Sequence, residues 1–153
     1  MSLEMVPLVE TSAQAIYWLV TFVIAGLVWW RGDRPERIGV LIVLAGFVFS
    51  GLVDQIYWGR VHGLVVLADG ALFAGFYALS LKYARWWIRG AAAFALLGFL
   101  SHFATLFDSS VMTWAYVTMI WLTSAGILLA LLASTAEVPF ARRYEIWVRQ
   151  GQS

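Results

Sequence analysis

The sequence predicts an all-α integral membrane protein with five transmembrane helices in an antiparallel up-and-down bundle. Of its 153 residues, 62% are hydrophobic and only 12% are charged. In soluble domains about 45 to 50% of the residues are apolar and about a quarter are charged. The apolar residues form five continuous runs, which favour helices over the alternating strands of a barrel. The connectors between these runs are short, and short connectors make sequential helices antiparallel neighbours.

Each apolar run approaches the roughly 20 residues that a helix needs to cross a hydrocarbon core of about 30 Å. The runs are separated by "RGDRPER", "GRVH", "KYARWWIR" and "DSS". We therefore expect one membrane domain over residues 1–153, with spans at about 14–30, 38–58, 63–81, 90–107 and 111–132.

The distribution of basic residues predicts how the chain is oriented, because cytoplasmic loops retain Lys and Arg. In the predicted topology Arg60 lies on one side of the membrane, and the other nine basic residues lie on the opposite side: Arg31, Arg34, Arg37, Lys82, Arg85, Arg89, Arg142, Arg143 and Arg149. We expect the N-terminus outside and the C-terminus in the cytoplasm, in a bacterial inner membrane.

The C-terminal segment "EVPFARRYEIWVRQ" has the pattern of a short amphipathic helix over about residues 139–150. Phe140, Tyr144 and Trp147 have the spacing of one helical face, and Arg142 and Arg143 fall outside it. Such a helix would lie on the cytoplasmic membrane surface with its arginines toward anionic lipid or a partner. The alternative is a frayed polar tail.

The composition excludes several classes of function. The net charge is +1 and the basic residues are dispersed, so nucleic acid is not expected as a partner. Cysteine is absent, which excludes disulfides, thiolate catalysis and Cys-ligated metals. The sequence indicates no particular cofactor.

Two ionisable residues inside the predicted spans are the main site candidates. Asp69 lies six residues after Gly63 in the third span, and His102 lies six residues before Asp108 at the end of the fourth. At about 1.5 Å per residue, both are roughly 9 Å below the outer surface, so they can meet. A carboxylate in a span normally faces the bundle interior and has a partner. Alternatively, Asp69 caps a helix that begins at Gly70, and His102 bonds to a backbone carbonyl or a Thr.

Three further residues belong to this candidate ligand or proton-relay site: Asp54, Ser101 and Thr105. Asp54 has a structural alternative, because Arg60 follows a short turn later and can pair with it. A metal site is a weaker hypothesis. His102, Asp69 and Asp108 are its candidate ligands, but the sequence has no tight ligand spacing such as HExxH.

Two classes of function fit these features. The first is a small non-enzymatic membrane protein, an accessory or ligand-binding subunit that contacts membrane-protein partners or further copies of itself. The second is a transporter, a proton-coupled protein or a membrane enzyme that uses the outer-side Asp69 and His102. A cavity that converges on Asp69 favours the second class, whereas an oligomer favours the first.

Overall fold

The structure of the protein is a computed structural model that describes residues 5–53, 63–107 and 113–150. Five helices follow one another in these ranges: α1 (Met5–Arg31), α2 (Arg34–Val53), α3 (Gly63–Lys82), α4 (Trp86–Phe107) and α5 (Thr113–Gln150). No strand occurs in these ranges, which confirms the all-α prediction.

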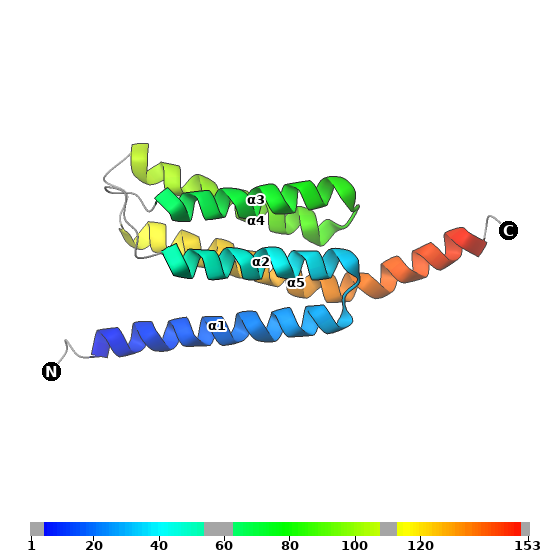
Figure 1. The fold of residues 1–153 in the computed structure, drawn as a ribbon, viewed down its shortest axis with the longest axis horizontal. Helices are drawn as coiled ribbons and strands as arrows, with labels where there is room; N and C mark the ends of the chain where they lie inside the picture. Colours follow the sequence, from blue (N-terminus) through cyan, green and yellow to red (C-terminus); the bar gives the residue numbers. More distant parts are fainter. Residues whose placement is uncertain (1–4, 54–62, 108–112, 151–153) are drawn as a thin grey trace.

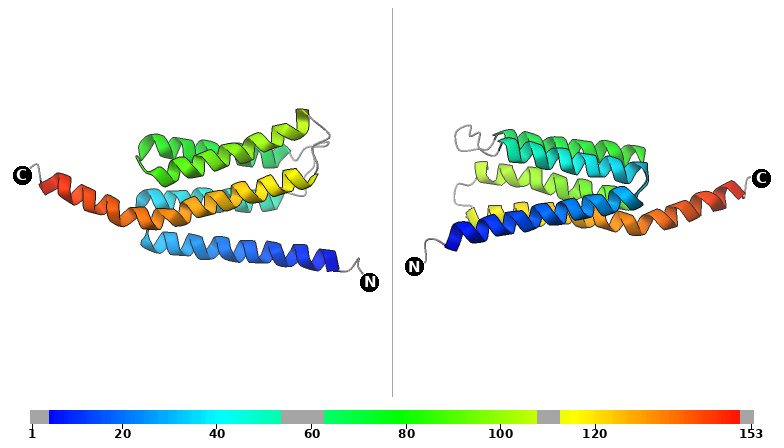
Figure 2. Two further views of the ribbon diagram at one scale, coloured as in Figure 1. Left: turned by 180° about the vertical axis from the view of Figure 1, so that it is seen from behind. Right: turned by 60° about the horizontal axis from the view of Figure 1, so that its bottom comes forward.

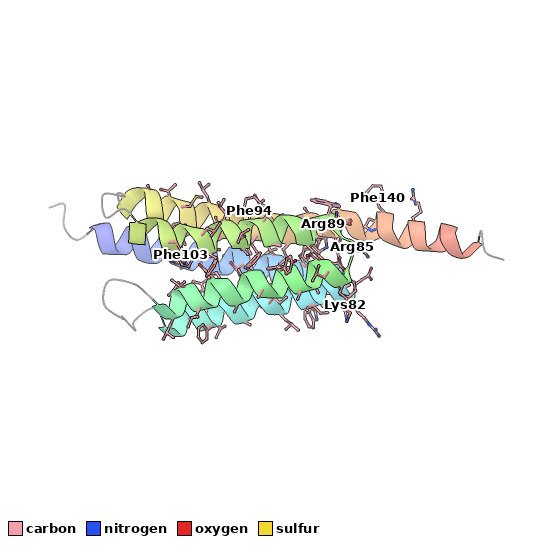
Figure 3. The ribbon with its side chains drawn as sticks, turned by 90° about the horizontal axis from the view of Figure 1, so that it is seen from above. Lys82, Arg85, Arg89, Phe94, Phe103 and Phe140 are labelled. Carbon is pink, nitrogen blue, oxygen red and sulfur yellow. The ribbon has the colours of Figure 1, made fainter. Side chains whose placement is uncertain are left out.

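The helices run alternately in opposite directions (Figure 1). Each helix packs against its neighbour in the chain, and α1 also packs against α5, so the contacts close into a ring. The α1–α2 and α3–α4 connections lie at the end where α5 leaves the bundle (Figures 1 and 2). We call this the basic end, because Lys82, Arg85 and Arg89 lie there (Figure 3).

A glycine and a capping carboxylate define the turn between α1 and α2. The Gly32 N–H donates to the Val28 carbonyl at 2.7 Å. A Cβ at Gly32 would lie 2.5 Å from both the Val28 oxygen and the Glu36 Cβ, so this close approach requires glycine. The Glu36 carboxylate accepts a bond from the Asp33 N–H at 2.9 Å. The start of α2 is thereby stabilised by half of a capping box.

The filled core lies toward the basic end, where α4 packs between α3 and α5. The indole of Trp87 is fully buried and meets the ring of Phe76 edge-on, with ring centroids 6.4 Å apart. Ala91 and Ala95, one and two helical turns further along α4, are also almost fully buried. The fully or almost fully buried apolar side chains of this core are Val28, Val40, Phe76, Trp87, Ile88, Ala91, Ala95 and Leu131.

α4 begins at Trp86, four residues before the expected start of the fourth span at residue 90. Trp87 and Ile88 are fully buried, although the sequence placed both in a connector. The Trp86 N–H donates to the Glu137 carboxylate of α5 at 3.4 Å, which satisfies a donor that the first helical turn leaves without an intrahelical partner. The earlier start therefore depends on packing and on a partner 51 residues away in the chain.

α5 is a single helix of 38 residues with Pro139 in its interior, so the expected interruption between residues 132 and 139 is wrong. Proline cannot donate to the carbonyl four residues earlier and crowds it, which bends a helix. Figure 1 shows α5 bending as it leaves the bundle. Ser134 and Val138 are buried, and Glu137 holds the start of α4, so packing keeps this segment helical.

The expected tail helix is therefore the last part of α5 and extends beyond the bundle (Figure 2). Phe140 and Arg143 are exposed, whereas the side chains of Arg142, Tyr144 and Trp147 lie outside the described part of the structure. At 1.5 Å per residue α5 is about 57 Å long, nearly twice a hydrocarbon core of about 30 Å.

The surface of the bundle is rich in large apolar side chains. Every helix exposes some of them, including Leu19, Leu41, Leu67, Leu97 and Leu129. By length and composition, two of the described segments are able to cross a membrane, Leu64–Lys82 and Val117–Phe140, and Ala15–Arg31 is a shorter apolar helix. These observations weakly suggest a membrane protein.

Candidate ligand-binding site

Asp69 and His102 meet between α3 and α4. The His102 Nε2 lies 2.7 Å from the Asp69 Oδ2, which confirms the predicted contact. An ionised carboxylate only accepts hydrogen bonds, so Nε2 carries the proton and donates it. The His102 side chain is 3% exposed and that of Asp69 is 28% exposed. The alternative in which Asp69 caps a helix starting at Gly70 is wrong, because α3 begins at Gly63.

Asp69 also forms part of the wall of a cavity inside the bundle. The cavity has a volume of about 190 Å³, is partly open, and extends from Ala95 and Ile127 of the core to Asp69 near the start of α3. All five helices contribute to it. Its apolar wall includes Val43, Phe47, Leu72, Phe94, Ala95, Ile120 and Ile127. Such a concave, mainly apolar space with a few polar groups is typical of small-molecule sites.

The polar side chains of the wall are Tyr17, Asp69, Thr123 and Ser124. The Thr123 hydroxyl donates within α5, to the carbonyls of Met119 and Ile120 at 3.0 Å each. The Tyr17 hydroxyl of α1 is hydrogen-bonded to the Ser124 side chain. These bonds orient the three hydroxyl groups, and the bond from His102 orients the Asp69 carboxylate. All four groups lie around the same cavity.

Tyr17, Thr123 and Ser124 were not predicted as site residues. Tyr17 near the outer end of the first span is typical of the aromatic belt at a membrane interface. An adjacent Thr and Ser inside an apolar run can also donate to carbonyls of their own helix. The available signal was "LTSAG" at 122–126, where two hydroxyl residues interrupt an apolar run. That pattern cannot show which helix face turns toward Asp69.

The remaining predicted site residues do not join the pair in the described structure. The Ser101 hydroxyl donates to the Gly98 carbonyl of its own helix at 2.7 Å. Thr105 belongs to α4, but its side chain lies outside the described part, and Asp54 and Asp108 lie outside it altogether. Among the residues that can be searched, no group of three metal-ligating side chains occurs.

A second polar cluster, which the sequence analysis did not identify, lies at the basic end. The Glu36 side chain is fully buried, and its carboxylate accepts bonds from the Trp87 indole N–H at 3.1 Å and from the Asp33 N–H. Arg85 lies 4.0 Å from the Asp33 carboxylate. These contacts join the starts of α2 and α4, so the cluster has a structural role. The signal was "DRPE" at 33–36, which has the spacing of a capping box.

Comparisons of the chain with protein-family models, with curated proteins and with solved structures gave no match. The candidate site is defined by a cavity shared by five helices, one carboxylate in its wall, and a buried histidine bonded to that carboxylate.

Proposed function

We propose that this chain is a multi-pass membrane protein that binds a small ligand in the cavity beside Asp69. The observation that carries the proposal is the cavity itself, which is walled by all five helices and contains the Asp69 carboxylate. A carboxylate inside an apolar helix is costly unless it has a partner or a function. His102 is one partner, and the cavity provides room for another.

The membrane part of the proposal is that all five helices cross the bilayer, with the N-terminus outside and the C-terminus in the cytoplasm of a bacterium. Two segments have the length and composition of spans, and all five helices expose large apolar side chains. Nine of the ten basic residues belong to the basic end and the C-terminal part of α5. This asymmetry supports a cytoplasmic location of that end.

The cavity favours a protein that acts through its interior over an accessory subunit that acts only through its surface. Three helices turn polar side chains toward this shared space, Tyr17 from α1, Asp69 from α3, and Thr123 and Ser124 from α5. A bundle that acts only through its outer surface has no need of such an arrangement.

Methyl NMR of alanine-labelled protein in lipid nanodiscs tests ligand binding directly. Ala95 faces the cavity, whereas Ala74 and Ala93 are exposed on the outside of the bundle. We expect added ethylbenzene to shift the Ala95 methyl signal in a saturable way, because its apolar body fits the wall. Ethylbenzene that merely dissolves in the bilayer would instead shift Ala74 and Ala93 without saturation.

Two glycine substitutions provide the matched controls. Gly98→Leu adds a side chain to the cavity wall, where even a Cβ would lie 3.2 Å from the Thr123 hydroxyl. Gly26→Leu adds the same side chain where a Cβ has no neighbour within 4 Å. The saturable shift should disappear in the first variant and persist in the second. Its absence from the unaltered protein, or its persistence in Gly98→Leu, argues against binding in the cavity.

A further inference from the structure

Asp69 and Thr123 present hydrogen-bond acceptors to the cavity. An ionised carboxylate offers about four lone-pair sites, and the bond from His102 uses one of them. The Thr123 hydroxyl proton is already directed to carbonyls of α5, so its oxygen still has a lone pair. No Lys or Arg is among the described residues of the wall. A ligand that donates hydrogen bonds therefore complements these two groups.

The charge of the wall has one sign. Asp69 is the acidic residue of the lining, and no Lys or Arg among the described lining residues balances its carboxylate. An anionic ligand would meet this carboxylate without a balancing cation in the wall. A cationic ligand would neutralise it inside an apolar bundle, where an isolated charge is most costly.

Aromatic rings line the same space. Tyr17, Phe47 and Phe94 belong to three different helices, and the rings of Tyr17 and Phe47 are stacked with centroids 5.2 Å apart. The faces of such rings attract ammonium groups and also pack against flat apolar groups. The wall therefore provides contacts for both the charged and the apolar part of one molecule.

We propose that the cavity selects a small organic cation. This cation has a primary ammonium group attached to an aromatic or similarly compact apolar body, which matches the acceptors, the carboxylate and the aromatic rings of the wall. This proposal rests on the proposed function, because it names the class of ligand for the same cavity. An apolar cavity of about 150 Å³ accepts benzene. In proportion, about 190 Å³ holds roughly eight non-hydrogen atoms, the size of benzylammonium.

Benzylammonium and ethylbenzene form a matched pair of probes, because they differ only in an ammonium group that replaces a methyl group. The dissociation constant of each is measured from the Ala95 methyl shift in nanodiscs, for the unaltered protein and for Asp69→Asn. We expect benzylammonium to lose at least about tenfold more affinity than ethylbenzene in Asp69→Asn, because a hydrogen bond to a charged group is lost.

Asp33→Asn is the control for net charge. It removes one negative charge at the basic end, away from the cavity, and asparagine also caps helices well. The ratio of the two dissociation constants should stay within about twofold of its original value in this variant, because Asp33 does not line the cavity. An equal change of the ratio in Asp33→Asn and Asp69→Asn would overturn the proposal.

The remaining outcomes separate this proposal from the proposed function. If ethylbenzene saturates the Ala95 shift and benzylammonium does not, the cavity binds ligands but does not select cations. If both bind and Asp69→Asn weakens them equally, Asp69 does not recognise the ammonium group, and the proposal is likewise overturned. If neither probe produces a saturable shift, ligand binding in the cavity fails as well.

Discussion

Asp69 has one described protein partner, and that partner is almost completely buried. His102 donates to its carboxylate over 2.7 Å, and its side chain is 3% exposed. If either residue is removed, the other is left in an apolar bundle without its hydrogen bond. The free energy of unfolding should therefore depend on the two residues jointly.

A double-mutant cycle measures this dependence. We expect Asp69→Ala and His102→Ala each to lower the free energy of unfolding by about 1 to 3 kcal/mol, because each breaks the hydrogen bond between the buried His102 and the Asp69 carboxylate. The double variant should cost less than the sum, with a coupling of about 0.5 to 3 kcal/mol. The measurement is reversible unfolding in mixed micelles with an increasing fraction of sodium dodecyl sulfate. Additive losses would show that the contact contributes nothing to stability.

The contact was predictable from the sequence, whereas most of the cavity wall was not. Sequence spacing gives depth, because antiparallel helices with short connectors and a rise of 1.5 Å per residue place Asp69 and His102 at one level. It does not give the rotation of each helix about its axis. Tyr17 and Ser124 reach the same cavity only because α1 and α5 turn those faces inward, and in helices that are apolar all round no stripe reveals that face.

At the scale of elements, the existence and order of the five helices followed from the apolar runs, but several boundaries did not. α1 begins at Met5 and α2 at Arg34, before the expected span starts at 14 and 38. α4 starts at Trp86 and α5 continues through Pro139. At the start of α4 the contact with Glu137 is the cause. A carboxylate that caps a helix far away in the sequence leaves no local pattern. The sequence therefore predicted a connector where α4 begins and an interruption before Pro139, whereas tertiary packing makes both segments helical.

The space around Gly26 and the space around Gly39 predict opposite effects of substitution by alanine. A Cβ at Gly26 in α1 has no neighbour within 4 Å, so Gly26→Ala should stabilise the protein by up to about 1 kcal/mol through helix propensity. A Cβ at Gly39 in α2 would lie 2.6 Å from the fully buried Trp87 ring. Gly39→Ala should therefore destabilise the protein by about 1 to 3 kcal/mol through overpacking.

The same micelle unfolding assay checks this pair, with each variant compared with the unaltered protein. Equal gains in stability from both substitutions would mean that α2 and α4 are not packed as closely as described at Gly39.

At the scale of the whole molecule, the packing is divided between two halves. The basic end has a filled core around Trp87 and a buried carboxylate, Glu36, that joins two helix starts. The other half has the cavity with Asp69 and His102. In the proposed topology the filled core lies toward the cytoplasm and the ligand site toward the outside.

This account depends most on the claim that the five helices cross the membrane with the basic end inside. The chain has no cysteine, so single cysteines report position without background. In intact cells, a membrane-impermeant thiol reagent should label cysteines introduced at Arg60 and Ser109, and it should label those at Asp33 and Gln152 only after the membrane is opened. Labelling of all four positions in intact cells, or of Asp33 and Gln152 alone, would contradict the account.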